Sequence, residues 1–433
     1  MSHRSIRFPV VALVAAVGAL VAASVTAGAA GSPAPIVVDD STAPSTITIG
    51  GAPVLNTTRT VQHWFGQTLD TNNGVTYGYN MVGVDPSTNG SATIPVDIIP
   101  LNFNVAGRSY NGTDVVPAIM ASPQFQTADY ASVSASSTLA GSRGPGGDLS
   151  AGNSGVQLED ATMRAQFNKV GTGYHLILGT PVVHPAITID VPSNHGVIAT
   201  RNPLRGVYFA DVDVTWFAAR LQNLNNSLGY VDPTHLPLYV TNSVMLYFGG
   251  NPANCCIIGF HGAGIVPGRS TGPVHGNGNQ PVLTYAWTSY ITPGTFNPIN
   301  SWAVQDIHAL SHEIAEWADD PFVNNTVEPW LTPTAPQYGC TGVLETGDPV
   351  VGIGFSKGVN TFEQGLTPGP DQKLQVADGT YHPEDEALLP WFMRSSPNTI
   401  SQPTQSPSAN IGRYTLMGDL NPFPGFRAPA TGC

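Results

Sequence analysis

Charged side chains are scarce in this chain. Asp, Glu, Lys and Arg make up only 10% of the 433 residues, with 16 basic against 29 acidic residues and a formal net charge of −13. This balance argues against nucleic acid or an anionic membrane surface as a partner. Glutamate is rare in the first part of the chain, where only Glu159 precedes Glu313. Closely spaced glutamates after that point are therefore informative.

Long apolar runs are absent after the first 30 residues. Residues 1–29 combine a basic start (HRSIR), an apolar run from 9 to 25 and a small-residue cleavage site (AGA), which together predict a signal peptide. No later stretch is long and apolar enough to span a bilayer. We therefore expect a secreted, extracellular protein that has no membrane span once the signal is removed.

Cysteine is also rare, with four in the chain. In an exported protein, Cys255, Cys256, Cys340 and Cys433 favour two disulfides. Adjacent cysteines pair with each other only through a strained eight-membered ring. We therefore expect one of Cys255 and Cys256 to pair with Cys340 and the other with Cys433. A metal site made of these thiols fits poorly, because oxidising surroundings compete for them.

The abundance of glycine (47) and proline (38) indicates many short strands and ordered loops. We expect a flexible lead-in at 30–60, a β-rich N-terminal half at 61–245, a metal-binding half at 246–394 and an extended tail at 395–433. Hydrophobic patterning predicts strands at 75–84, 92–105, 174–183, 236–248 and 282–291, and helices at 156–167 and 215–228. Whether the first half forms its own domain or completes the same sheet stays open.

The segment WAVQDIHALSHEIAEWADDP (302–321) predicts an amphipathic helix. Its apolar residues gather on one side, and His308, His312, Glu313, Glu316 and Asp319 gather on the other. His312 and Glu316 stand one turn apart with Glu313 between them, so the motif is HExxE, the zincin motif HExxH with a carboxylate for its second histidine. The alternative is a surface helix that displays its charges to water.

A hydrolytic zinc site needs three protein ligands and an open position, and zinc accepts imidazole nitrogen or carboxylate oxygen. His312 and Glu316 supply two ligands. We expect Glu345 in LETGDP to be the third, while Asp348 fixes the turn by side-chain hydrogen bonds or serves as ligand instead. A second arrangement pairs His308 with His312, which leaves Glu313 outside the usual position between the ligands.

Other candidates are less specific. His261 could line a cleft or bind substrate, but we favour a histidine satisfied by local backbone, and Tyr338 is a possible cleft residue. The stretch from Gly268 to Gly272, with Ser270 at its centre and His275 nearby, matches the GxSxG pattern of serine hydrolases. That motif needs a helix after it, which the prolines and glycines that follow exclude.

The segments ALSHEIAEWADDPFVNN and LETGDP resemble a group of uncharacterised exported bacterial proteins with an SHExxE helix, an Asn/Asp-Pro exit and a downstream Glu-x-Gly-Asp element. The segments CCIIGFHGA, YAWTSY and PWF extend this resemblance over 243–396. More distantly, the chain is similar to the phosphate-induced protein (EXORDIUM-like) family. The resemblance implies a zincin-like metallopeptidase domain, with His312, Glu316 and Glu345 as metal ligands and Glu313 as base; His308 is not part of its pattern.

Two hypotheses follow. The first is a secreted zinc-dependent endopeptidase with an α+β, zincin-like mixed sheet packed on the active-site helix, acting on a polypeptide. Two carboxylate ligands make the site anionic, which would also suit a harder ion such as Ca²⁺. We expect Zn²⁺ and regard Ca²⁺ as the less favoured alternative. The second is a non-catalytic extracellular protein that binds a matrix or wall component and keeps a structural or vestigial metal site.

Overall fold

The computed structural model describes residues 49–50, 59–70, 72–130, 135–137, 154–167, 169–202, 207–265, 281–296, 304–331, 340–362, 379–394, 415–416 and 433. Within these residues the protein is a mixed α+β structure in which strand outweighs helix, at about 41% against 22%. The predicted signal peptide, most of the lead-in and most of the tail lie outside these residues. No helix among the described residues is long and apolar enough to cross a membrane.

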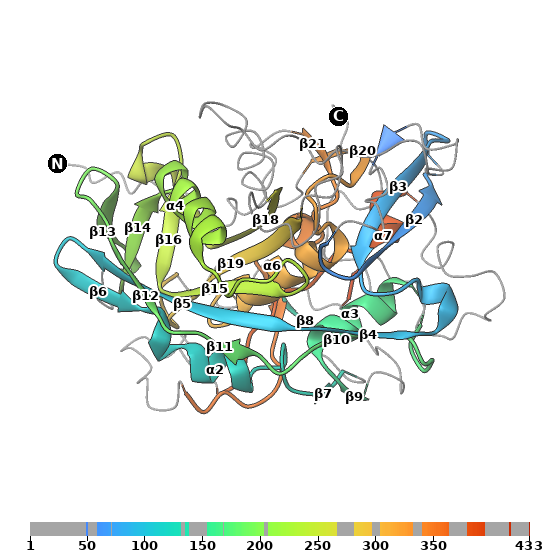
Figure 1. Ribbon diagram of the computed structural model, residues 1–433, viewed down its shortest axis with the longest axis horizontal. Coiled ribbons are helices and arrows are strands. Elements are labelled where there is room, and N and C mark those ends of the chain that lie inside the picture. Colours follow the sequence, from blue (N-terminus) through green and yellow to red (C-terminus); the bar gives the residue numbers. More distant parts are fainter. Residues whose placement is uncertain are drawn as a thin grey trace, which may run out of the picture.

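The centre of the fold is a seven-stranded mixed sheet (Figure 1). Its main path runs β11 (Val182–Val183), β5 (Val96–Val105), β15 (Leu236–Asn242), β19 (Val282–Tyr290) and β18 (Gly259–Ile265). Two further strands, β12 (Ile187–Asp190) and β6 (Arg108–Asn111), also pair with β5. The three inner strands β5, β15 and β19 are parallel, and β18 runs antiparallel to β19. Strands from both predicted halves therefore share one sheet.

The inner strands are apolar on both faces because the sheet is covered on both sides. Every residue of β19 is buried, as expected for a parallel strand between two layers. Ala286 and Tyr290 of β19 belong to one hydrophobic core, and Leu283, Tyr285 and Trp287 belong to the other. Side chains of a strand point alternately to opposite faces. The even-numbered residues of β19 therefore define one face and the odd-numbered residues the other.

A different helix packs on each of these faces. On the even-numbered face, α6 (His308–Asp319) contributes Leu310, Ile314 and Trp317 to the core, and Trp317 Nε1 donates a 2.9 Å hydrogen bond to Thr284 Oγ1 of β19. On the opposite face, α4 (Val214–Ser227) contributes Phe217, Leu221 and Leu224. The sheet thus holds α6 in a fixed position against β18 and β19.

Smaller elements surround this centre. The other helices are α2 (Val116–Ala121), α3 (Leu158–Gln166), α7 (Leu389–Phe392) and the 3₁₀ turns Pro86–Thr88, Gly112–Asp114, Pro252–Asn254 and Asp348–Val350. The other strands are β1 (Ile49–Gly50), β2 (His63–Leu69), β3 (Thr76–Val82), β4 (Ser91–Ile94), β7 (Ala128–Asp129), β8 (Ala135–Ser137), β9 (Ser154–Val156), β10 (His175–Leu178), β13 (Gly196–Asn202), β14 (Val207–Asp213), β16 (Val244–Tyr247), β17 (Cys255–Ile257), β20 (Thr326–Leu331), β21 (Cys340–Val343) and β22 (Ile353–Phe355). In the part of the chain that the structure describes, these strands form six further small sheets, the largest with the order β13-β14-β16-β17.

Most of the predicted elements are present, but their boundaries differ. The helices predicted at 156–167 and 215–228 correspond to α3 and α4. The strand predicted at 236–248 is two strands, because Ser243 adopts a left-handed backbone (φ 50°) and the chain passes from the central sheet into β16 of another sheet. The short helix α2 was not predicted.

The predicted disulfide connectivity is wrong. Cys255 pairs with Cys256, and Cys340 pairs with Cys433. The peptide bond between Cys255 and Cys256 is cis, and their Cα atoms lie 3.0 Å apart. The prediction that all four cysteines form disulfides is confirmed.

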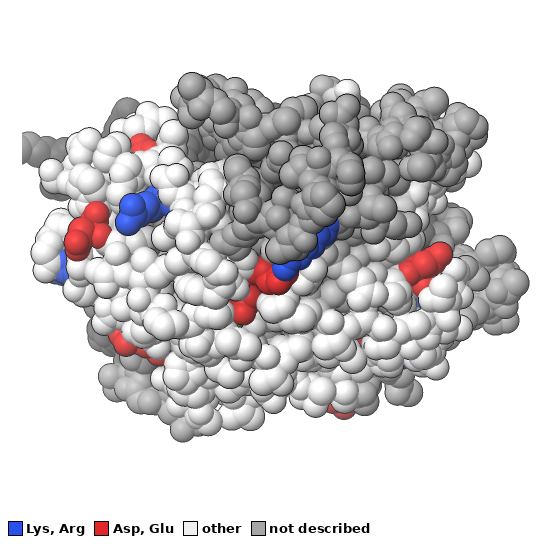
Figure 2. All heavy atoms as spheres, in the orientation of Figure 1, with Lys and Arg blue, Asp and Glu red and all other residues white. Residues whose placement is uncertain are grey.

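The acidic side chains are largely hidden from the surface. Figure 2 shows few charged side chains on the described part of one face. Every residue of α6 is buried, including its polar side. The alternative interpretation of this helix as a solvated surface helix is therefore excluded. Its polar residues face other protein groups.

Candidate metal centre

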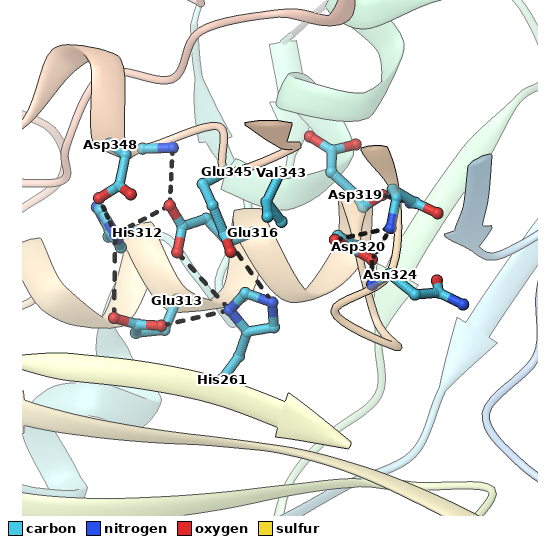
Figure 3. Close-up of polar contacts among 12 residues, drawn as sticks. His261, His312, Glu313, Glu316, Asp319, Asp320, Asn324, Val343, Glu345 and Asp348 are labelled. Carbon is cyan, nitrogen blue, oxygen red and sulfur yellow. Dashed lines mark hydrogen bonds and ion pairs between the residues drawn. The ribbon is translucent and has the colours of Figure 1, made fainter. Parts of the chain in front are cut away.

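The polar side of α6 carries the first two donors. His312 and Glu316 lie one turn apart, and His312 Nε2 is 3.1 Å from Glu316 Oε1. The backbone N–H of Gly347, from the loop before the Asp348 turn, donates to the same oxygen at 3.3 Å (Figure 3). The predicted pairing of imidazole and carboxylate along the helix is therefore present in the structure.

The segment 344–348, here called the Glu345 loop, places Asp348 beside this pair. Asp348 Oδ1 is 3.9 Å from His312 Nε2. A Cβ atom on Gly347 would overlap the imidazole ring of His312, so the loop approaches the helix closely only because this residue is glycine. The backbone N–H of Leu344 donates to Asn325 O at 3.0 Å, which fixes the start of the loop.

Asn325 connects this loop to the end of α6. Its side chain donates to Asn80 O at 2.8 Å and to Asp319 O at 2.7 Å, and it accepts from Asn80 N at 2.9 Å. Asp320 accepts from the backbone N–H of Asn325 at 3.1 Å. These bonds join the helix end to β3 and give the DDPFVNN segment a structural role, namely to position the chain that leads toward the candidate metal centre.

A further donor is His261, which the sequence suggested only as a possible cleft residue and not as a metal ligand. In the register of β18 and β19 it pairs with Ala286, a residue on the face that α6 covers. Its Nδ1 is 3.7 Å from Glu313 Oε2 and 3.7 Å from Glu316 Oε2. The expectation that local backbone satisfies His261 is therefore wrong. Only the pairing of β18 with β19 brings the residue to the helix, and no local pattern signals that pairing.

Glu345 reaches the centre from the side of His261. Its Oε2 is 3.9 Å from His261 Nε2 (Figure 3), whereas Asp348 lies on the side of His312. Glu345 as the third ligand of the His312 ion stays a prediction. We refer to six residues as the carboxylate–histidine cluster: His261, His312, Glu313, Glu316, Glu345 and Asp348. Their exposed fractions are all 4% or less.

Two overlapping groups in this cluster could hold a metal ion. One is His312, Glu316 and Asp348, and the other is His261, Glu313 and Glu316; within each group the donor atoms lie within 4.8 Å of one another. Tetrahedral zinc ligands at about 2.0–2.2 Å from the ion lie roughly 3.3 Å apart. The separations of 3.1 and 3.9 Å around His312 bracket this value.

Several donor atoms lack a hydrogen-bond partner. They are His312 Nε2, His261 Nε2, Glu313 Oε2, Asp348 Oδ1 and both carboxylate oxygens of Glu345. A buried polar atom without a partner is costly, and such atoms are rare in folded proteins. That so many such atoms lie within one buried cluster fits a bound cation.

Glu384 contacts His312 on the Nδ1 side of its ring, away from the cluster. Its Oε2 is 2.8 Å from His312 Nδ1 and 3.0 Å from His308 Nε2, and its backbone N–H donates to Ser311 Oγ at 2.8 Å. This leaves Nε2 of His312 free to face the cluster, as in metal sites where a carboxylate orients the ligating imidazole. His308 contacts Glu384, so the alternative His308–His312 ligand pair gains no support. Sequence analysis missed Glu384, which lies in a segment without a motif.

Burial and the charges of neighbouring groups shift the pKa values of the carboxyl groups in the cluster. Burial, followed by the charge of Glu316, raises the pKa of Glu345 and of Asp348 well above the ordinary range. Burial raises the pKa of Glu313 to about 7. Burial alone would raise the pKa of Glu316 as well, but the neighbouring histidines outweigh it and lower the value to about 2. The cluster contains more carboxylates than imidazoles, and a cation would compensate this excess.

The pKa values of the two imidazoles are also raised, but the cause is neighbouring negative charge and not burial. Burial would lower the pKa of His312, but the charges of Glu316 and Glu384 outweigh it and hold the pKa well above the ordinary value. Burial would likewise lower the pKa of His261, but the negative charge of Glu345 is the main cause that raises it well above the ordinary value. Both rings therefore sit in a strongly negative environment, which attracts a proton or a metal cation.

The remaining predicted site residues lie outside the described part of the chain. They are Tyr338 and the GxSxG segment 268–272 with His275. Comparison of this chain with protein-family models, with curated proteins and with solved structures finds no match.

Proposed function

We propose that this protein is a secreted, zinc-dependent hydrolase, and specifically a metalloendopeptidase. His312, Glu316 and Asp348 would hold the ion. The observation that carries the proposal is that one donor atom from each of these three residues lies within 4.8 Å of the others. His312 presents Nε2 to this group, because its Nδ1 lies 2.8 Å from Glu384 Oε2. This combination of one oriented imidazole and two carboxylates is within the donor set that zinc accepts.

In this proposal Glu313 would act as the general base. Its Oε1 lies 4.0 Å from His312 Nε2, on the side of the imidazole that faces the proposed ion. A zinc ion there would act as a Lewis acid toward a substrate carbonyl and lower the pKa of an adjacent water molecule. Glu313 would accept a proton from that water and pass it to the leaving amine. Gly259 gives this side chain room, because a Cβ atom there would collide with the carboxyl group of Glu313.

The peptide substrate and the export of the protein rest on the sequence. The SHExxE and LETGDP segments resemble a group of exported proteins with a zincin-like pattern, and residues 1–29 have the composition of a signal peptide. Zinc is favoured over Ca²⁺ because an imidazole nitrogen is a central donor, whereas Ca²⁺ takes oxygen ligands.

A structural ion in a non-catalytic extracellular protein that binds a matrix or wall component is the second candidate. The observation that favours it is the deep burial of all six residues of the cluster. Structural metal sites are closed, whereas catalytic sites keep a position open for water and substrate.

One comparison separates the two candidates. The mature chain and its Glu313→Gln variant are analysed for bound zinc and for cleavage of casein and of a mixed peptide library. The hydrolase predicts zinc in both proteins and a loss of turnover of about 100-fold or more in the variant. Glu328→Gln is the matched control, because Glu328 contacts Asn72 away from the cluster. Zinc in both proteins with no turnover in either would favour the structural ion.

A further inference from the structure

Glu316 and Glu313 each face both histidines of the cluster. Glu316 Oε1 lies 3.1 Å from His312 Nε2, and its Oε2 lies 3.7 Å from His261 Nδ1. Glu313 repeats this arrangement, with Oε1 4.0 Å from His312 Nε2 and Oε2 3.7 Å from His261 Nδ1. Two carboxylates therefore lie between two imidazoles, and each carboxylate directs a different oxygen to each ring (Figure 3).

A carboxylate whose two oxygens face separate nitrogen donors has the arrangement of a bridging ligand. Two-metal sites place their ions about 3.5–4 Å apart, a spacing that one carboxylate can bridge. The donors of the cluster fall into two sets that share Glu316: His312 and Asp348 on one side, His261 and Glu313 on the other. The hydrolase site described above uses only the first set.

We propose that the cluster holds a second divalent transition-metal ion, bound by His261 Nδ1, Glu313 and Glu316, with Glu316 as the bridge to the first ion. This inference rests on the proposed function for the identity of the first ion and adds a position to the same site. Zinc is the expected occupant, because it accepts both imidazole nitrogen and carboxylate oxygen as ligands.

Unpartnered buried atoms on the His261 side support this position independently. Glu313 Oε2 has no hydrogen-bond partner, and its residue is only 1% exposed. Both oxygens of Glu345 are also unpartnered. If His261 binds metal through Nδ1, its Nε2 carries the proton and faces Glu345 Oε2 at 3.9 Å. Glu345 would then be the carboxylate nearest the outer nitrogen of His261, although at a longer distance than the 2.8 Å that separates Glu384 from His312.

The second ion would compete with catalysis. Glu313 is both the proposed base and a ligand of the second position, and an oxygen bound to a cation is a weaker proton acceptor. Occupation of the second position should therefore lower turnover. Excess zinc should inhibit the wild-type protein and should inhibit a variant that lacks His261 much less.

The number of bound ions tests the proposal without reference to activity. The mature chain is stripped with a chelator and dialysed against graded Zn²⁺, and protein-bound zinc is measured by mass spectrometry. We expect two ions per wild-type chain and one in His261→Gln. The matched control is His175→Gln, a histidine of β10 that contacts Asp160 outside the cluster, and it should keep two. One ion in the wild-type chain, or two in His261→Gln, would overturn the second position.

The outcomes separate this proposal from the proposed function. A wild-type chain that binds no zinc overturns both, whereas one that binds a single ion overturns only the second position. A spectroscopic measurement covers the case in which His261→Gln does not fold. Two Co²⁺ ions bridged by one carboxylate couple magnetically, so the electron paramagnetic resonance signal after two equivalents should be less than the sum of two isolated ions. A simple additive signal would contradict the shared site.

Discussion

The carboxylate of Glu384 and the imidazole of His312 form a buried pair, with Oε2 2.8 Å from Nδ1. The pair joins two segments 72 residues apart, and it determines which nitrogen of His312 faces the cluster. Glu384 therefore contributes to the site without belonging to the motif that revealed it.

Replacement of Glu384 should weaken metal binding without removing a ligand. We expect Glu384→Gln to lower zinc affinity by about 10- to 100-fold, because the amide orients His312 less strongly than the carboxylate does. Competition with a fluorescent zinc chelator measures the change, and Glu328→Gln should leave the affinity unaltered. An unchanged affinity in Glu384→Gln would show that the imidazole needs no such support.

Gly347 should be intolerant of even one added carbon atom. Its φ of −77° suits any residue, so Gly347→Ala tests only the collision of the new Cβ with the ring of His312. We expect a loss of about 1–3 kcal/mol in the free energy of unfolding together with weaker zinc binding. The control is Gly342→Ala, where the nearest atom to a new Cβ lies 3.5 Å away, an ordinary contact. Denaturant unfolding and zinc titration of both variants provide the comparison.

Asn325 should be more important for stability than its neighbour Asn324. Removal of the Asn325 side chain leaves Asn80 N, Asn80 O and Asp319 O without this partner in a buried region. We expect Asn325→Ala to lower the free energy of unfolding by about 3 kcal/mol or more, since each unpaired buried group costs about 1–3 kcal/mol. Asn324→Ala should cost much less, because Asn324 Oδ1 has no hydrogen-bond partner to lose. Equal losses in urea unfolding would contradict this assignment.

Asp319 should make stability depend on pH. Burial raises its pKa to about 8, from 3.8 in the unfolded chain. Below about pH 4 both states hold the proton. Between about pH 4 and 8 the unfolded state releases it and the folded state does not, so the free energy of unfolding falls by up to about 1.4 kcal/mol per pH unit. Asp319→Asn has no such proton and should become more stable relative to wild type as the pH rises. Metal-free protein unfolded in urea at pH 5 and 7.5 tests this, with the exposed Asp114→Asn as control. A pH-independent difference would contradict the shift.

The helix at 308–319 and one pair of donor residues could be predicted from the sequence alone. His312 and Glu316 are four residues apart, so helical geometry alone brings them together. The apolar strands at 92–105 and 282–291 were also predictable, because a parallel strand buried on both faces carries a continuous apolar run. Such predictions succeed where the physical cause lies within a few neighbouring residues.

The rest of the site depends on contacts between distant segments. His261 enters the cluster through the register of β18 on β19, Asp348 through the close approach at Gly347, and Glu384 through a segment that has no periodicity. Each of these relationships is set by tertiary structure.

The disulfide between Cys340 and Cys433 closes a covalent loop of the chain that contains part of the site. Glu345, Asp348 and Glu384 all fall within the ring that this bond closes, whereas His261, His312, Glu313 and Glu316 fall before it. A protease that nicks the backbone at one point between Cys340 and Cys433 would therefore leave these three carboxylates tethered to the remainder of the molecule, and the pieces would separate only after reduction and unfolding.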